Sequence, residues 1–264
     1  MYEFEYKRVK KVADATAALK KDEEAKILAG GMTLIPTLKM RLANPSQLLD
    51  LAGVDDLKGI SVSGGVVTIK AMTPHAAVAG SKDVAMAIPA LAHLAEGIGD
   101  PAVRNRGTIG GSISNNDPSA DYPAAVVGLG ATVKTTDRKI PGDEFFKGMF
   151  ETALQPGEIV TEVSFPVPEK AGYCKFPNPA SRYAIVGVFV SKSKAGVRVA
   201  VTGAGPGVFR VPEMEKALAA NWSPDAVAKI KIGADGLNAD IHASAEYRAH
   251  LIAVMAKRAV AAAG

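Results

Sequence analysis

Two short segments that each carry a pair of glycines constrain this 264-residue chain most. The first is Ala29-Gly30-Gly31-Met32-Thr33, and the second, about eighty residues later, is Thr108-Ile109-Gly110-Gly111-Ser112. Because glycine has no Cβ, successive backbone N–H groups can turn toward one anion at close range. A Gly-Gly pair by itself is a common turn. Two pairs, each expected at a strand–loop–helix junction, predict a clamp for the diphosphate of a dinucleotide.

Composition limits the class of protein. The apolar fraction of 48% can fill more than one hydrophobic core, and a net charge of +4 is too small for a nucleic-acid-binding footprint. The single cysteine, Cys174, cannot hold an iron–sulfur cluster, which takes about four thiolates, and it is typical of a reducing compartment. The first residues lack the apolar core of a signal peptide, and no apolar run reaches the roughly 20 residues of a membrane span. We therefore expect a cytoplasmic protein.

Hydrophobic periodicity predicts a small β-α-β unit at the start of the chain. It consists of a helix near residues 12–20, a strand that ends at residue 28, the first glycine pair, a helix to residue 41 and a returning strand at residues 48–51. Thr33 is placed to cap the second helix, and Pro36 falls in the first turn, where a missing N–H is tolerated. We expect this first lobe to end near Gly53.

Short β-like segments follow, and Gly64-Gly65 predicts a tight hairpin between two of them. Helices are expected at residues 89–97, 122–129 and 244–262, and strands at residues 158–167, 184–190 and 197–201. The polar segment before the second glycine pair, residues 99–107, is expected to be a loop. The last helix is expected to dock on a sheet, with Arg248 largely outside its apolar stripe. We place a domain boundary between residues 166 and 172.

Other patterns with known chemistry are missing. The sequence contains no G-x-G-x-x-G, Walker, H-E-x-x-H or paired C-x-x-C motif. The four histidines are scattered, so we assign no catalytic residue and no metal site. Of the carboxylates, Asp117 and Asp121 lie beside the second glycine pair and lead into a helix. Asp121 is either the N-cap of that helix or a ligand-binding group.

Taken together, these segments resemble the FAD-binding medium subunit of the molybdenum hydroxylases, the xanthine dehydrogenase family, and most resemble the aerobic carbon monoxide dehydrogenase type. The resemblance rests on the two glycine motifs in order, with Asp100-Pro101-Ala102-Val103-Arg104-Asn105-Arg106-Gly107 directly before the second. Supporting segments are residues 48–51, 69–75, 98–99 and 178–183. The similarity runs nearly from end to end.

The resemblance implies an α+β fold in two parts. Residues 1–170 would form a two-lobed FAD-binding domain of the vanillyl-alcohol-oxidase or PCMH type, with lobes of about 1–53 and 54–170. Residues 173–264 would form a carbon monoxide dehydrogenase flavoprotein-like C-terminal domain, a small α+β unit with an antiparallel sheet and helices. The FAD would lie between the two lobes.

The resemblance also implies which residues bind the cofactor. The first motif would wrap the diphosphate and the second would close over it, while Asp121 would hold the sugar part. Tyr183 would either cover one face of the isoalloxazine or be a half-buried strand tyrosine. The full set is Leu28, Ala29, Gly30, Gly31, Met32, Thr33, Leu34, Ile98, Gly99, Thr108, Ile109, Gly110, Gly111, Ser112, Asp121, Ile159, Val160, Lys175 and Tyr183. Met32 stands where a Gln, His or similar polar residue is common in the family, and Ser112 stands where Asn is common, so two possible side-chain hydrogen bonds to FAD are weakened or shortened.

As a member of this family, the chain would bind FAD and transfer electrons without hydroxylating a substrate itself. The molybdenum cofactor would lie in a large subunit and iron–sulfur clusters in a small one, in a dimer of heterotrimers. The electron acceptor would be a quinone, NAD or oxygen. Any attachment to the inner face of the membrane would be through partners. Arg104 and Arg106 would either tune the reduced flavin or bind a neighbouring subunit.

Three alternatives stay open from the sequence. The chain is the flavin subunit of an aldehyde, purine or N-heteroaromatic dehydrogenase of the same family, a self-sufficient flavin oxidoreductase on a related scaffold, or an adaptor that has lost its cofactor. The residues from Tyr173 onward show no convergent polar set for a substrate, and only Met32 and Ser112 favour the adaptor.

Overall fold

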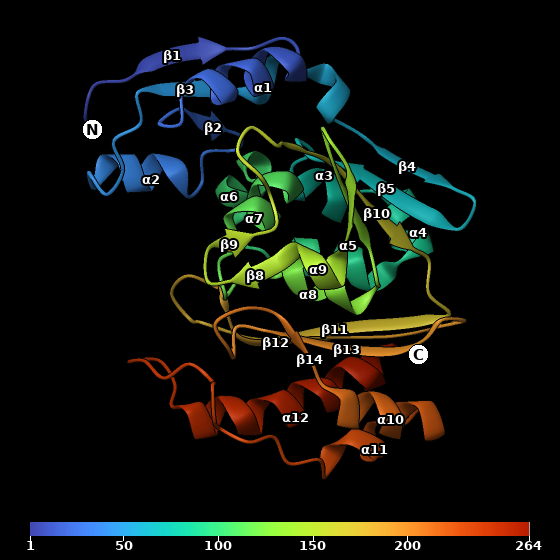
Figure 1. Cartoon of the computed structure of the whole chain (residues 1–264). Helices are drawn as coiled ribbons and strands as arrows, with labels where there is room; N and C mark the ends of the chain where they lie inside the picture. Colours follow the sequence, from blue (N-terminus) through green and yellow to red (C-terminus); the bar gives the residue numbers. More distant parts are fainter. Residues whose placement is uncertain (264) are drawn as a thin grey trace.

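The computed structural model describes residues 1–263, which stack as a first lobe, a middle lobe and a C-terminal layer (Figure 1). The first lobe is a parallel sheet with strand order β1-β3-β2 and two helices. Its elements are β1 (Glu5–Arg8), α1 (Val12–Lys21), β2 (Lys26–Leu28), α2 (Leu34–Lys39) and β3 (Gln47–Asp50). The predicted β-α-β unit is confirmed, and β1 is an additional strand that the pattern did not reveal.

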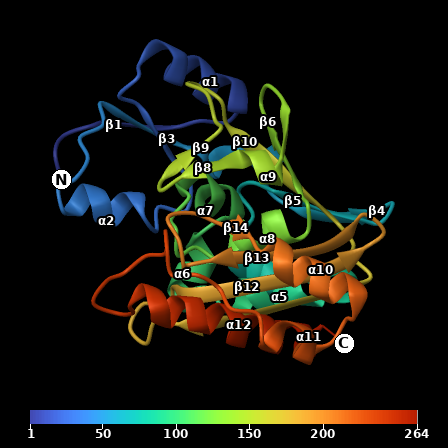
Figure 2. The same ribbon diagram turned by 60° about the horizontal axis from the view of Figure 1, so that its bottom comes forward.

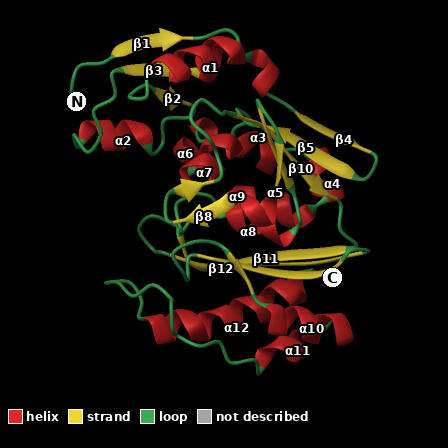
Figure 3. Cartoon of the chain, in the orientation of Figure 1, coloured by secondary structure: helices red, strands yellow, loops and turns green. Residues whose placement is uncertain are grey.

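The middle lobe is an antiparallel five-stranded sheet, in the order β4-β5-β10-β6-β7, packed against short helices (Figure 3). Its strands are β4 (Ile60–Ser63), β5 (Val66–Lys70), β6 (Thr132–Thr135), β7 (Lys139–Pro141) and β10 (Val160–Pro166), with a separate hairpin of β8 (Phe146–Gly148) and β9 (Glu151–Thr152). Its helices are α3 (His75–Ala79), α4 (Lys82–Ala87), α5 (Pro89–Glu96), α6 (Pro101–Arg106), α7 (Ile109–Asn115), α8 (Tyr122–Gly128) and α9 (Gly142–Phe145). The predicted Gly64-Gly65 hairpin is confirmed, with φ of 57° and 75° at the two glycines.

The expectation of a long polar loop at residues 99–107 is wrong. Residues 101–106 form α6, and the second glycine pair lies inside α7. The side chain of Asp100 accepts the N–H of Val103 at 2.9 Å, and Thr108 accepts the N–H of Gly111 at 3.2 Å. Both are N-caps, and Pro101 occupies the first helical position, where it is favoured. The capping residues therefore turn this polar segment into two short helices.

The C-terminal layer is an antiparallel sheet in the order β11-β12-β13-β14, followed by helices. Its elements are β11 (Lys170–Pro177), β12 (Ala184–Ser193), β13 (Gly196–Thr202), β14 (Phe209–Arg210), α10 (Pro212–Ala220), α11 (Pro224–Ala228) and α12 (Ala245–Ala262). Helices α10 and α12 cover one face of this sheet, and α5 and α8 of the middle lobe cover the other (Figures 1 and 2). Because both faces are covered, β12 is buried along residues 184–191.

Two features of this layer differ from expectation. Strand β11 begins inside the segment that we expected to be a domain boundary. The strand was missed because the glycine and prolines of this segment are typical of a linker. Arg248 is buried rather than placed outside the apolar stripe: its guanidinium donates to the carbonyls of Ile185 at 2.7 Å and Gly203 at 2.9 Å and pairs with Asp240. In residues 1–263, no helix has the length and apolar character needed to cross a membrane.

Candidate functional site

The two glycine motifs lie against each other although they belong to different lobes. A Cβ added at Gly30 would lie 2.1 Å from the carbonyl oxygen of Arg106, directly before the second motif. A Cβ at Gly111 would lie 3.5 Å from the Cβ of Ala29. Since real Cβ atoms do not approach a backbone oxygen within 3.0 Å, only glycine at position 30 permits this contact. The predicted pairing of the two motifs is therefore present in the fold.

The first motif presents a row of free backbone donors. Among the described residues, the N–H groups of residues 30–34 have no hydrogen-bond partner, and Gly31 adopts a φ of 77° that favours glycine. Thr33 occupies the N-cap position of α2 but makes no side-chain cap bond, so the expected capping by Thr33 is wrong. Backbone N–H groups are obligatory donors, and five successive free ones can bind an anion.

The second motif uses its donors within the protein. The N–H groups of Ile109 and Gly110 donate to the carbonyls of Thr73 at 3.2 Å and Ala71 at 2.9 Å, and Gly111 donates to Thr108. A Cβ at Gly110 would lie 2.6 Å from the Cβ of Ala71. The N–H groups of Ile109, Gly110 and Gly111 are therefore not turned to the same anion as those of the first motif. The glycines of the second motif instead allow α7 to approach strand β5 and the first motif closely.

Asp121 is a buried carboxylate held by the C-terminal layer. It makes no N-cap bond to α8. Its carboxylate accepts a hydrogen bond from the hydroxyl of Tyr173 and pairs with the ammonium of Lys175 at 2.9 Å. Burial raises the pKa of the Asp121 carboxyl, and Lys175 and Tyr173 act in the opposite direction. Burial and Asp121 also raise the pKa of Tyr173 well above 10, so this hydroxyl stays protonated and donates.

Tyr183 reaches across to the first lobe. It lies just before β12, outside the strand, and 44% of its surface is exposed. Burial of its hydroxyl and the carboxylates of Asp117 and Asp121 raise the pKa of Tyr183, whereas a hydrogen bond with the Thr33 side chain lowers it. The side chain of Tyr183 therefore reaches Thr33 of the first glycine motif.

The other predicted residues fall into three groups. Ile98 and Gly99 form a half-buried turn between α5 and α6, and Lys175 reaches this turn by donating to the carbonyl of Gly97 at 2.9 Å. Ile159 and Val160 are buried with their side chains in the hydrophobic cores of the first and middle lobes. Leu28 and Leu34, which flank the first motif, are half-buried, and Met32 within it is exposed. Ser112 is half-buried in the first turn of α7.

The sequence did not single out His75, which lies behind the second motif. A Cβ at Gly107 would lie 2.6 Å from its Nε2, and its ring is 5.3 Å from that of Tyr122. Burial, with a smaller contribution from the positive charge of Arg104, lowers the pKa of His75 to about 4. The histidine is therefore neutral at pH 7. Its Nδ1 and the Tyr122 hydroxyl are both buried without a hydrogen-bond partner among the described residues.

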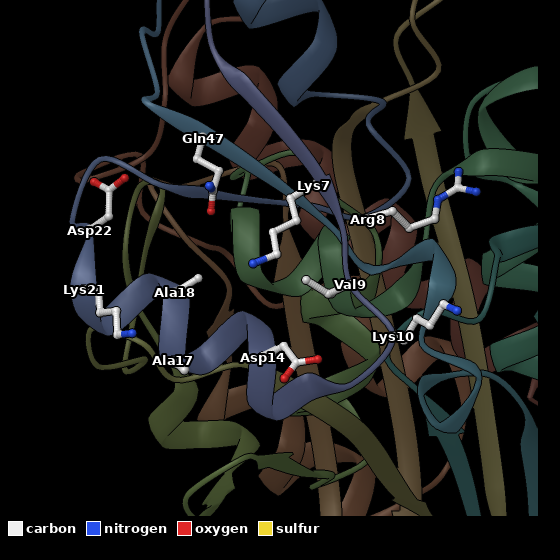
Figure 4. Close-up of a pocket in the computed structure, with 10 residues that line it drawn as sticks. All are labelled: Lys7, Arg8, Val9, Lys10, Asp14, Ala17, Ala18, Lys21, Asp22 and Gln47. Carbon is white, nitrogen blue, oxygen red and sulfur yellow. The ribbon is translucent and has the colours of Figure 1, made fainter.

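A surface hollow of about 630 Å³ lies elsewhere, between β1 and α1 of the first lobe (Figure 4). It is lined by Lys7, Arg8, Val9, Lys10, Asp14, Ala17, Ala18, Lys21, Asp22 and Gln47. No residue of either glycine motif lines it, and its charged side chains are of both signs. This hollow is therefore not part of the candidate site.

Family models match the two parts of the chain. Residues 2–168 match the FAD binding domain in molybdopterin dehydrogenase, and residues 171–263 match the CO dehydrogenase flavoprotein C-terminal domain. The nicotine 6-hydroxylase medium subunit of Paenarthrobacter nicotinovorans is 36% identical over 96% of this chain and 94% of that protein. The carbon monoxide dehydrogenase medium chain of Afipia carboxidovorans is also 36% identical, over 97% and 95%.

Solved structures agree with these matches. A chain in the crystal structure of the cyanide-inactivated Cu,Mo-CO dehydrogenase has a TM-score of 0.87 and 34% identity, covering 100% of this chain and 98% of its own length. A chain of quinoline 2-oxidoreductase from Pseudomonas putida 86 has a TM-score of 0.89 and 28% identity, covering 99% and 96%. The α+β fold expected from the resemblance is confirmed. The chain belongs to the FAD-binding medium subunits of the molybdenum hydroxylases, and it is the flavoprotein component of an oxidoreductase.

Proposed function

We propose that this chain holds FAD between its first and middle lobes and carries electrons from an iron–sulfur subunit to an external acceptor. The observation that carries the proposal is the row of free N–H donors at residues 30–34 beside the second glycine motif. A diphosphate needs several donors at close range, and the five successive free N–H groups supply them. The donor set therefore fits the cofactor that the family binds.

Each predicted contact has a defined part in this proposal. Residues 28–34 hold the diphosphate with backbone N–H groups, and residues 108–112 close the site with small surfaces rather than with donors. Ile98 and Gly99 flank the flavin, and Tyr183 covers it. Asp121 holds the sugar through the carboxylate that Lys175 and Tyr173 keep in place. Ile159 and Val160, which are buried in the lobe cores, support the lobes from behind.

FAD supplies the ability to take electrons singly from clusters and to release two together. We propose a large subunit with the molybdenum cofactor and a small iron–sulfur subunit as partners, in a dimer of heterotrimers. The acceptor would be a quinone, NAD or oxygen. This chain would contribute the binding and the electrostatic surroundings of the cofactor, with no catalytic residue of its own.

We propose that the large subunit selects the substrate. The relatives with 36% identity include both a nicotine hydroxylase subunit and a carbon monoxide dehydrogenase subunit, so identity in this subunit does not separate a gas from an N-heteroaromatic compound. Carbon monoxide, aldehydes, purines and N-heteroaromatic compounds are therefore the substrates to test. We further propose domains at 1–170, with lobes at about 1–53 and 54–170, and at 173–264, and a cytoplasmic complex.

Native mass spectrometry of the tagged chain, purified from its own cells, tests this function. We expect FAD together with a large molybdenum-containing chain and a small iron–sulfur chain. Anaerobic addition of each candidate substrate should then bleach the flavin absorbance only for the true substrate. FAD on a solitary chain would instead support a self-sufficient flavoenzyme, and partners without any flavin would support an adaptor.

A further inference from the structure

The turn between α5 and α6, residues 97–99, is held by two cationic side chains. Lys175 donates through Nζ to the carbonyl of Gly97 at 2.9 Å. Arg104 donates through Nη1 to the carbonyls of Ile98 at 3.0 Å and Gly99 at 3.3 Å. Three successive carbonyl oxygens therefore accept hydrogen bonds from ammonium or guanidinium groups, which are stronger than neutral ones.

The backbone of this turn needs such support. Helix α5 ends at Glu96, so the carbonyls that follow have no helical partner. Gly99 has a φ of 49°, and a Cβ there would lie 2.9 Å from the Cβ of Val103. The turn is thus pressed against α6 in a left-handed conformation. The planar fork of an arginine can serve two neighbouring carbonyls at once, which a lysine ammonium does less well.

The two cations differ in their electrostatic surroundings. Lys175 is paired with the buried carboxylate of Asp121 at 2.9 Å, so its charge is locally neutralised. Arg104 is half-buried and makes no ion pair with a carboxylate among the described residues. The positive charge of Arg104 affects a neighbouring group, since it contributes to the lowered pKa of His75. A fixed, uncompensated positive charge therefore lies beside the turn.

We propose that Arg104 is a positioning residue that fixes the Ile98–Gly99 turn against the flavin and raises the reduction potential of the bound flavin. The inference rests on the FAD site proposed above, in which this turn flanks the ring. A flavin gains negative charge on reduction, and a fixed positive charge nearby stabilises that charge. Of the two interpretations left open for Arg104, tuning of the flavin is the one that its contacts support.

Arg106 offers a matched control on the same helix. It is exposed, and its side chain has no hydrogen-bond or ion-pair partner among the described residues. Arg104→Gln removes the charge but keeps two amide donors for the carbonyls, Arg104→Lys keeps the charge but loses the fork, and Arg106→Gln removes a charge without touching the turn.

The test measures the flavin reduction potential by dye equilibration, and the FAD dissociation rate by fluorescence, in the assembled complex. We expect Arg104→Gln to lower the potential and to change the dissociation rate by less than about threefold. Arg104→Lys should keep the potential near that of the wild type and release FAD roughly tenfold faster. Arg106→Gln should shift the potential less than Arg104→Gln does. Thermal unfolding confirms that each variant is folded.

The outcomes separate the two proposals. If the wild-type complex contains no FAD, the proposed FAD site itself is refuted. Wild-type complex with FAD, and an unchanged potential and dissociation rate in both Arg104 variants, would overturn the role of Arg104 alone. An equal fall in potential for Arg106→Gln and Arg104→Gln would also overturn it, because the effect would then be that of surface charge in general.

Discussion

The two glycine motifs share a Gly-Gly pair but hold their glycines in different backbone environments. In the first, residues 30–34 keep five N–H groups free, and Gly31 is left-handed. In the second, Ile109, Gly110 and Gly111 all donate within the protein, and the glycines allow a helix to touch a strand. The comparison teaches that a Gly-Gly pair indicates a close backbone approach, and that only the fold decides whether a ligand or another segment makes that approach.

Gly30→Ala tests the first motif and should have the largest effect. The added Cβ would lie 2.1 Å from the Arg106 carbonyl, so the lobes must separate at the proposed diphosphate site. We expect the FAD dissociation constant to rise at least about 100-fold, which is roughly 2.7 kcal/mol. Fluorescence titration of the apo complex measures it. Retention of FAD at wild-type affinity would show that the two motifs do not form one site.

Gly110→Ala tests the second motif. Here the Cβ would meet the Cβ and carbonyl of Ala71 at 2.6 and 2.8 Å, inside the middle lobe. Overpacking of this kind costs about 1–3 kcal/mol, so we expect the Tm to fall by roughly 5 °C, while the folded protein binds FAD within about tenfold of the wild type. Differential scanning calorimetry gives the Tm. A variant with an unchanged Tm and no FAD would mean that Gly110 faces the cofactor instead of the strand.

His75, behind the second motif, should give the domain an acid-sensitive stability. Its pKa is about 4 when folded and near 6.5 when unfolded. Between these two values His75 binds a proton in the unfolded chain but not in the folded one. The free energy of unfolding therefore falls as the pH drops from 6.5 toward 4. We expect a loss of about 2 kcal/mol between pH 7 and pH 5. Urea unfolding at both pH values measures it.

The matched variants for this experiment are His75→Gln and His242→Gln. His75→Gln cannot titrate, so its loss of stability between the two pH values should be smaller than that of the wild type by about 2 kcal/mol. His242 is exposed, so His242→Gln should keep the wild-type pH dependence. The same pH dependence in all three proteins would contradict a buried neutral His75.

The two threonines at the helix starts should give the smallest difference. Thr108 accepts the N–H of Gly111, whereas Thr33 makes no cap bond. Thr108→Ala should therefore cost about 1 kcal/mol of unfolding free energy, and Thr33→Ala less than about 0.5 kcal/mol. Chemical denaturation of both variants measures the two losses of unfolding free energy. Equal losses would mean that the two helix starts are capped alike.

Much of the fold could be predicted from local patterns. The first lobe follows from apolar periodicity, and the hairpin at Gly64-Gly65 follows from turn chemistry, since both signals involve neighbours in the chain. Strand β11 was missed because Gly172 and the prolines around it imitate a linker, and α6 was missed because its polar residues conceal two N-caps. Arg248 was misplaced because the carbonyls that it binds are 45 and 63 residues away.

The candidate site, like the fold, could be predicted from the sequence only in part. That the two glycine motifs belong together could be predicted from their expected strand–loop–helix settings and from the family resemblance. The roles of their N–H groups could not, because the acceptors at Ala71 and Thr73 belong to a different segment. Nothing in the sequence around His75 indicated that this residue is buried behind the second motif. Tyr173 and Lys175, two positions apart on one strand, lie on the same face, so their shared contact with Asp121 could have been found.

The buried Arg248 bears on the order of events during synthesis. It fixes the carbonyls of Ile185 and Gly203, and Ile185 is two residues beyond Tyr183. A chain still growing on the ribosome has made both glycine motifs long before residue 248 emerges, and N-terminal parts generally fold first. The nascent chain therefore has both glycine motifs before the segment that carries Tyr183 is anchored. If Tyr183 covers the flavin as proposed, stable capture of the cofactor follows translation of α12.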